Sequence, residues 1–305
     1  MNFGIEIRDA ENVILEDIEI TGDRKCVGIF IVFSENVKVI RPHIHDVHWS
    51  LDTVTRTTRE QASGIEVDRS EKIDILEPTI ERLGRIVRPP FGVVRKEYWN
   101  TDGITFAGCR HFSVSGGKID QCGECIDITG RDPQEQFVIR GVNVSNADNA
   151  GIKIANSART GIVDSCIAEG CYNGFGVGGP DSVAAGAPIP VDVSDIQFSN
   201  CQAINNGVRP TMASALHQIP SAGFVLGFQG FKPEVPRGIV FVDCLAANRE
   251  GQPPADFGFK GDPGLTFRVS SDPRQNRALN CRVINAIQEV YQISWYSQFE
   301  QPGWV

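Results

Sequence analysis

A short sequence phrase recurs along this chain: a glycine followed by alternating branched or aromatic residues. Its clearest copies begin at Gly4, Gly28, Gly64, Gly103, Gly151, Gly174 and Gly223. Recurrence at this spacing is typical of chains built from stacked units, each of which buries its apolar face against the next. Equivalent residues of stacked strands lie about 4.8 Å apart. The phrase therefore predicts which side chains are neighbours in space.

A second short strand follows most of the glycine-led strands, as at 37–40, 73–76 and 238–241. Both kinds of strand alternate with period two and are rich in Ile, Val and Phe, which is typical of half-buried strands. No stretch has the pattern of a helix. We therefore expect an all-β fold, a single-stranded right-handed parallel β-helix of about nine coils.

The repeats differ in length, and the longer ones predict where loops leave the stack. Successive glycines are 24 residues apart at Gly4 and Gly28 but 49 apart at Gly174 and Gly223. The extra residues fall near 46–62, 82–101, 179–193 and 206–222. Insertions of this kind cluster on one face of a solenoid, often the binding face. Residues 1–305 form one domain in this interpretation, and we expect an N-terminal cap to be missing because the first coil begins at once.

Composition narrows the possible functions. The net charge of −9 argues against a general nucleic-acid binder, which needs a basic surface. No apolar run is long enough to span a membrane, and no secretory signal precedes the first coil. The localisation stays open, either cytoplasmic or secreted.

The nine cysteines favour a structural interpretation over disulfides or zinc. Cys166, Cys201, Cys244 and Cys281 recur just after the second strand of their coils. This placement predicts a ladder of small buried thiols that point inward.

Acidic residues recur on the outward positions of the glycine-led strands. Stacking makes Asp102 and Glu124 neighbours, with Asp127 and Lys153 beside them and Asp148 on the next turn. Carboxyl groups that stack repel each other, so one of them acquires a raised pKa. Such pairs supply a general acid beside a general base.

A family resemblance rests on the same residues. The run Asn100-Thr101-Asp102-Gly103 resembles the Asn-Thr-Asp-Gly motif of polygalacturonase-type glycoside hydrolases, which are pectin-lyase-like right-handed parallel β-helices. The next family motif, Gly-Asp-Asp before a strand, falls on 122–128. The resemblance implies that Asp102 and Glu124 occupy two of three catalytic acid positions and that the reaction inverts the anomeric centre.

The sequence also departs from that family. Gly123 and Glu124 replace the Asp pair, and Asn149-Ala150-Gly151 lacks the histidine of the Gly-His-Gly motif. The Arg-Ile-Lys motif is also missing, and the following coil carries Tyr172-Asn173-Gly174-Phe175 in its place. We therefore expect a relative that acts on another sugar polymer rather than polygalacturonase itself.

The insertions add basic and aromatic residues to an acidic protein, which favours an anionic ligand because Arg matches carboxylate geometry. The residues assigned to substrate binding are Arg88, Arg95, Lys96, Trp99, Lys153, His48 and Trp49. The favoured function is acid/base hydrolysis of a uronate-containing polysaccharide or oligosaccharide. Asp102 and Glu124 form the pair, and Asp127 or Asp148 assists.

Alternatives stay open on the same fold. A polysaccharide lyase or a uronate C5-epimerase would take its base from Tyr98, Lys96, Lys153 or His48. No cofactor is required, although Asp68, Asp102, Glu124 and Asp127 are possible calcium ligands. His43 and His45 share one face and suggest zinc, but no further ligand is evident. The non-enzymatic alternative is a glycan-binding β-helical spike or adhesin, which would form a trimer. The oligomeric state expected for the chain is a monomer or a homotrimer.

Overall fold

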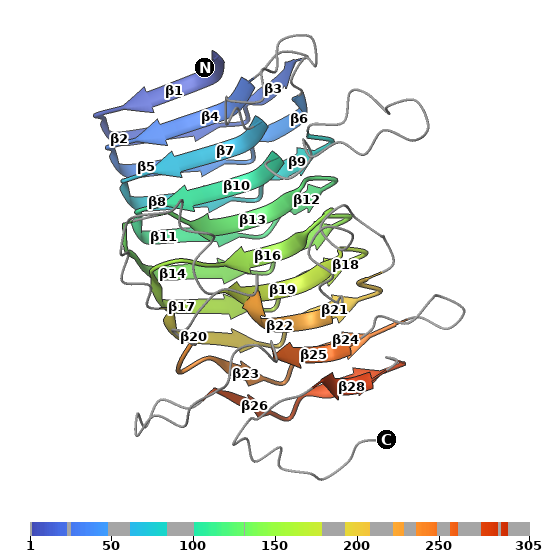
Figure 1. The fold of residues 1–305 in the computed structure, drawn as a ribbon. Helices are drawn as coiled ribbons and strands as arrows, with labels where there is room; N and C mark the ends of the chain where they lie inside the picture. The colour runs from blue at the N-terminus through green and yellow to red at the C-terminus, as the bar shows by residue number, and fades with distance from the viewer. Residues whose placement is uncertain are drawn as a thin grey trace, which may run out of the picture.

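The computed structural model describes residues 2–22, 26–47, 62–83, 101–130, 132–178, 193–207, 222–228, 236–248, 257–261, 276–285 and 288–291. All regular structure in these residues is β-strand (Figure 1). Within these ranges, no helix has the length and apolarity needed to cross a membrane.

The strands form three parallel sheets. The first sheet contains β1 (Asn2–Arg8), β4 (Cys26–Val32), β7 (Ala62–Asp68), β10 (Thr101–Ala107), β13 (Glu124–Thr129), β16 (Ala150–Ile154), β19 (Asn173–Gly178), β22 (Ala222–Phe228), β25 (Phe257–Gly261) and β28 (Gln288–Tyr291). The second contains β2 (Glu11–Glu16), β5 (Glu35–Ile40), β8 (Glu71–Leu76), β11 (Arg110–Ser115), β14 (Gln134–Arg140), β17 (Ala158–Asp164), β20 (Ser194–Ser199), β23 (Val240–Val242) and β26 (Arg277–Leu279). The third contains β3 (Glu19–Gly22), β6 (His43–Val47), β9 (Thr79–Glu81), β12 (Lys118–Asp120), β15 (Asn143–Ser145), β18 (Ile167–Glu169), β21 (Gln202–Ile204), β24 (Leu245–Ala247) and β27 (Arg282–Ile284).

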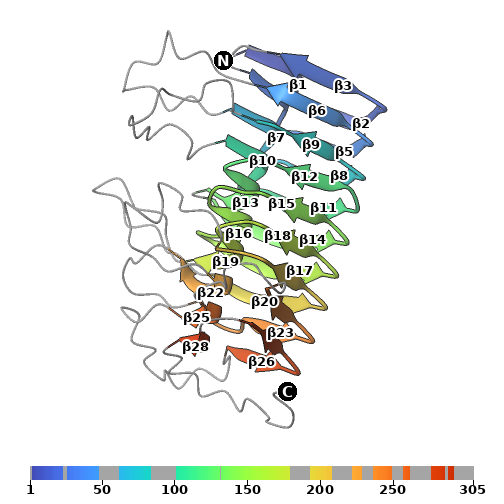
Figure 2. The ribbon, with the colours of Figure 1, turned by 90° about the vertical axis from the view of Figure 1, so that its right-hand side faces the viewer.

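Each coil contributes one strand to each sheet in turn, so the chain winds as a right-handed parallel β-helix (Figures 1 and 2). The predicted fold class is confirmed: the sheets hold ten, nine and nine strands among the described residues. The strands of the third sheet were not anticipated as a separate set. Most of them are only three residues long, which is too short for a periodic pattern in the sequence.

The repeated glycine marks the corner where the chain passes from the third sheet to the first. A Cβ atom at Gly28 would lie 2.6 Å from the carbonyl oxygen of Gly64 and 2.9 Å from Ile44 Cγ2. A Cβ at Gly103 would likewise meet the Cys125 carbonyl and Ile119. No side chain fits at this corner, so the glycine is required by close packing.

The same corner interrupts the alternation of the first-sheet strands. Gly103 faces the interior residue Ile119, and the next residue, Ile104, is also buried in the core. Two successive inward positions leave Asp102 and Thr105 together on the outer face of the sheet. A hydrogen bond from Thr105 Oγ1 to Asp102 Oδ2 at 3.1 Å confirms that they share this face.

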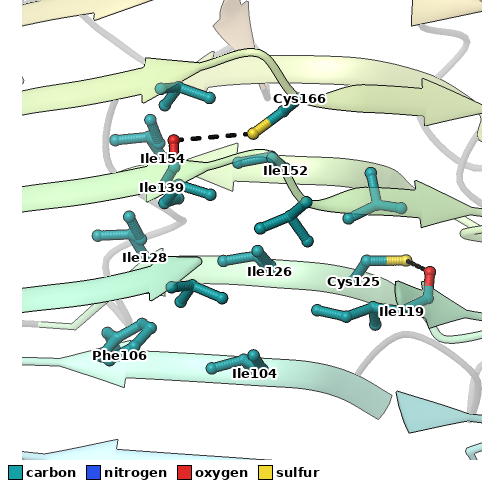
Figure 3. Close-up of a cluster of buried hydrophobic side chains, with 14 of the residues drawn as sticks. Ile104, Phe106, Ile119, Cys125, Ile126, Ile128, Ile139, Ile152, Ile154 and Cys166 are labelled. Atoms are coloured by element: carbon teal, nitrogen blue, oxygen red, sulfur yellow. Dashed lines mark hydrogen bonds between the residues drawn. The ribbon is translucent and has the colours of Figure 1, made fainter. Parts of the chain in front are cut away.

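The core runs along the inside of the coils as stacked rows of aliphatic and aromatic side chains (Figure 3). Phe106 stacks on Phe112 with ring centroids 4.1 Å apart, and Phe112 stacks on Phe137 at 5.5 Å. Rows of this kind bury a continuous apolar surface, which is the main source of stability in such a stack.

The cysteine ladder is present as predicted. Cys166, Cys201 and Cys244 are buried, Cys281 is partly exposed, and all four are free thiols. Cys166 Sγ donates to the Ile139 carbonyl oxygen, as drawn in Figure 3. The ladder is therefore a structural part of the core.

Three of the predicted insertions follow a third-sheet strand and precede a first-sheet strand, whereas the one near 179–193 lies between β19 of the first sheet and β20 of the second. Most of each insertion, namely 48–61, 84–100, 179–192 and 208–221, lies outside the described residues.

Candidate functional site

The register of the first sheet places the predicted acids side by side. Asp102 on β10 pairs with Glu124 on β13, and Thr105 pairs with Asp127. Asp127 in turn pairs with Lys153 on β16. The predicted proximity of these four charged residues is thus confirmed, although their chemical roles stay predictions.

This group of side chains is buried although it points away from the interior of the β-helix. Asp102 and Glu124 are each 3% exposed, Asp127 is 5% exposed and Lys153 is 4% exposed. The sequence predicted a solvent-facing row here. Burial raises the cost of every unpaired charge, so the contacts within the group decide which residues are ionised.

Lys153 links two of the three acids. Its Nζ donates to Glu124 Oε2 at 2.9 Å and to Asp127 Oδ2 at 3.4 Å. Asn149 Nδ2 donates to the other oxygen of Glu124. The buried ammonium group offsets the negative charge next to it, so Lys153, Glu124 and Asp127 form one ion-paired group.

Asp102 differs from its neighbours. Its Oδ2 accepts the hydrogen bond from Thr105, whereas its Oδ1 has no hydrogen-bond partner among the described residues. Burial, together with the negative charge of Glu124, raises the pKa of Asp102 to about 8, although Lys153 and the Thr105 hydroxyl oppose the shift. Asp102 therefore carries a proton at neutral pH, as anticipated for one member of a stacked acid pair.

A second carboxyl group stands one coil earlier. Glu66 on β7 pairs with Thr105. The pKa of Glu66 is raised, mainly by burial and to a smaller extent by the negative charge of Asp68. Its Oε2 also has no hydrogen-bond partner in the described part of the chain. The face thus combines two carboxyls with raised pKa values, on β7 and β10, with the two carboxyls of β13 that pair with Lys153.

The motif residue Thr101 fixes the turn that leads into Glu124. Its Oγ1 accepts a hydrogen bond from the backbone N–H of Gly123 at 2.9 Å, and its carbonyl oxygen accepts from the same N–H. The threonine of the Asn-Thr-Asp-Gly run therefore helps to set the position of Glu124 against Asp102.

A calcium ion does not fit this group well. One oxygen from each of Asp102, Glu124 and Asp127 lies within 4.8 Å of the others. However, the ammonium of Lys153 already contacts two of these acids, and a cation would have to displace it. Asp68, the fourth suggested ligand, forms an ion pair with Arg69 at 2.7 Å.

The remaining predicted site residues have different outcomes. Asp148 is partly exposed and its backbone N–H donates to the Cys122 carbonyl, so its assisting role stays a prediction. The other predicted residues, Tyr98, Arg88, Arg95, Lys96, Trp99, His48 and Trp49, lie outside the described residues.

Sequence reasoning missed Asn149, Thr105 and Glu66 as partners of the acids. Asn149 stands in the turn before β16, and strand alternation gives no information about side chains in turns. Thr105 and Glu66 were visible in the outward row, but nothing in the sequence indicated that this row is buried. Only the structure shows that this row of side chains is buried.

No protein-family model matches this sequence, and no curated protein matches it either. Solved structures do match. An alginate lyase from Paenibacillus sp. str. FPU-7 aligns over 90% of this chain and 78% of its own, with a TM-score of 0.55 and 13% identity. A polygalacturonase from Erwinia carotovora ssp. carotovora aligns over 88% of this chain and 59% of its own, with a TM-score of 0.57 and 14% identity.

A tailspike protein of E. coli bacteriophage HK620, solved as a mutant in complex with a hexasaccharide, also matches. It aligns over 95% of this chain and 45% of its own, with a TM-score of 0.59 and 9% identity. The chain therefore spans about half the length of the polygalacturonase and of the tailspike. At these identities the likeness shows the fold alone, a right-handed parallel β-helix.

Proposed function

We propose that this protein is a carbohydrate-active enzyme that hydrolyses glycosidic bonds in a uronate-containing polysaccharide or oligosaccharide. The observation that carries the proposal is the pairing of Asp102 with Glu124 in one buried group. Asp102 carries a proton at neutral pH and Glu124 forms an ion pair with Lys153, an arrangement that suits a general acid beside a general base.

The roles follow from the contacts. Thr105 donates to Oδ2 of Asp102, which leaves Oδ1 to carry the proton. That proton would pass to the glycosidic oxygen as the bond to the sugar breaks. Glu124 or Asp127 would then accept a proton from the attacking water. Lys153 contacts both of these carboxyl groups and offsets their negative charge.

The comparisons support a carbohydrate as the ligand. The similar structures include a polygalacturonase, an alginate lyase and a tailspike solved with a hexasaccharide. They do not separate hydrolysis from elimination. Because Asp102 is only 3% exposed, the side chains that bury it have to move before a glycosidic oxygen reaches Oδ1.

Within this site the contacts of Lys153 favour hydrolysis over a lyase or epimerase reaction. A lyase base must be free to take up a proton, whereas the Nζ of Lys153 is engaged in ion pairs with two buried carboxyl groups. Asp102, in contrast, already carries the proton that a hydrolase donates.

The test is incubation of the wild type and Asp102→Asn with a panel of uronate-containing polysaccharides. New reducing ends and the ultraviolet absorbance of unsaturated products are both measured. We expect reducing ends without that absorbance in the wild type. The variant should lose about 10²- to 10⁴-fold in rate, as for a lost general acid.

The matched control is Asp120→Asn, because Asp120 is also buried but lies on the third sheet, where it accepts hydrogen bonds from Ser145 and Asn146. It should keep the wild-type rate. Unsaturated products would contradict hydrolysis and indicate a lyase. Tight binding of an oligosaccharide without any product would indicate the glycan-binding alternative.

A further inference from the structure

A second group of polar side chains lies on the outer face of the third sheet, near its N-terminal end. His43 and His45 on β6 both point outward because Ile44 between them is fully buried in the core. Glu19 on β3 pairs with His43 in the register of the sheet. The two imidazole rings lie close together, with centroids 4.4 Å apart.

The ligand atoms of this group are spaced as a small metal site requires. One atom each from Glu19, His43 and His45 lies within 4.8 Å of the others. Glu19 Oε1 is 3.1 Å from His45 Nε2. Two ligands of a tetrahedral zinc ion lie about 3.3–3.5 Å apart, given zinc–ligand bonds of about 2.0–2.1 Å. Binding would therefore require only small side-chain movements.

A carboxylate behind His45 fixes the orientation of its ring. Asp46 Oδ2 lies 2.7 Å from His45 Nδ1. Asp46 is itself held by two hydrogen bonds from Arg82, each 2.8 Å long. This contact leaves Nε2 on the side of Glu19, where a bound metal ion would replace the proton on that nitrogen. Metal-binding histidines commonly have such a carboxylate partner on the other ring nitrogen.

The surroundings favour a cation. The group holds three carboxylates, those of Glu19, Asp46 and Glu81, and one guanidinium, that of Arg82, so negative charge is in excess. Arg82 pairs with Asp46 and with Glu81, which also lies 3.7 Å from His43 Nε2, so Glu19 is the carboxylate of this group that no arginine holds among the described residues. His45 is mostly buried whereas Glu19 is exposed, so an ion can enter from solvent.

We propose that Glu19, His43 and His45 bind a divalent transition-metal ion of the zinc class, with Asp46 as the outer partner of His45. Two imidazoles and one carboxylate leave the fourth position of a tetrahedral ion to water, as in zinc sites that carry out chemistry. The two histidines were visible in the sequence, but the third ligand comes from the neighbouring coil. The site is separate from the acids of the first sheet and does not depend on the proposed hydrolysis.

The experiment titrates chelator-treated protein with Zn²⁺ by calorimetry and with Co²⁺ by visible absorption. We expect one ion per chain and the intense d–d bands of tetrahedral Co²⁺. His45→Ala and Glu19→Gln should each abolish these bands. Asp46→Asn should weaken Zn²⁺ binding by about 10- to 100-fold, because it removes only the outer partner.

His111→Ala is the control, since His111 is an exposed histidine on the second sheet that lies 3.8 Å from a carboxylate of Glu71. It should bind Zn²⁺ as the wild type does. Absence of Zn²⁺ uptake at micromolar concentration would overturn the proposal. So would uptake that His45→Ala and Glu19→Gln leave unchanged, or thiolate charge-transfer bands from Co²⁺, which would place the ion on cysteines.

Discussion

The outer faces of the first and third sheets carry charged groups built by the same stacking rule but placed in different surroundings. On the first sheet, Asp102 and Glu124 are almost fully buried. On the third sheet, the side chains of Asp46 and Arg82 are each 39% exposed. Both groups bring side chains of neighbouring coils into contact, so the difference between them lies in access to water.

Access to water decides which interactions shift the pKa of a side chain. Burial is the largest cause of the raised pKa of Asp102. The pKa of His45 is also raised, but its largest causes are the hydrogen bonds to Asp46 and Glu19. Thus Asp102 holds a proton because its charge is costly in a buried site, whereas the pKa of His45 is raised because its hydrogen-bond partners attract the proton. The following predictions test this contrast, from the largest expected effect to the smallest.

Removal of Lys153 should produce the largest effect. Lys153→Met leaves Glu124 and Asp127 buried without their cation, and loss of one partner of a buried ion pair costs about 3–5 kcal/mol. The free energy of unfolding at neutral pH, from urea denaturation, measures the loss. Lys72→Met, which removes an exposed partner of Glu35, is the control and should change stability far less. Equal effects of the two variants would contradict the role of burial.

The pH dependence of stability should reveal the proton on Asp102. An unfolded aspartate loses its proton near pH 3.9, whereas Asp102 in the folded protein loses it near pH 8. Between these values the folded state holds more protons, so stability falls as pH rises, by at most about 1.4 kcal/mol per pH unit. Asp102→Asn stays neutral and should show a shallower slope from pH 4 to pH 8.

Asp120→Asn serves as the control for that slope. Burial alone would raise the pKa of Asp120, but hydrogen bonds from Asn146 and Ser145 lower it overall. Its contribution to stability is therefore lost only as the pH falls below about 4. This variant should keep the wild-type slope between pH 4 and pH 8. If Asp102→Asn also keeps that slope, Asp102 is ionised throughout and the proposed general acid is wrong.

Truncation of Asn149 should produce an intermediate loss of stability. Asn149→Ala leaves one oxygen of buried Glu124 without its donor, which costs about 1–3 kcal/mol. Asn36→Ala removes an exposed amide that donates to Asn12 on the second sheet and should cost less. Urea denaturation of both variants measures the difference. No loss in Asn149→Ala would mean that water replaces the amide and that the group is more accessible than the structure shows.

The smallest effect is expected on the third sheet. Arg82→Ala removes ion pairs to Asp46 and Glu81, but the half-exposed guanidinium contributes only about 0–1 kcal/mol. Added salt should reduce the difference from the wild type further, because exposed charges are screened. Denaturation at low and high salt measures both effects. A loss as large as that of Lys153→Met would show that this face is as effectively buried as the first sheet.

Much of the fold follows from local sequence signals. The recurring glycine marks a corner that excludes any side chain, so its spacing predicts the coils and the pairing of Asp102 with Glu124. The third-sheet strands have too few residues for a periodic signal. The contacts of Asn149 with Glu124 and of His45 with Glu19 join residues from different coils. Which of these residues meet depends on how the turns between strands fold, and only the structure shows that.

The sequence by itself determined the stacked architecture, the inward rows of the core and the identity of the acids that become neighbours. These features depend on strand alternation and on the uniform spacing of coils, which are local properties of the chain. Only the tertiary structure decided that Asp102 is buried and protonated, that Lys153 neutralises Glu124 and Asp127, and that Glu19 joins the two histidines. Those features depend on exclusion of water and on distances between coils, which no single stretch of sequence specifies.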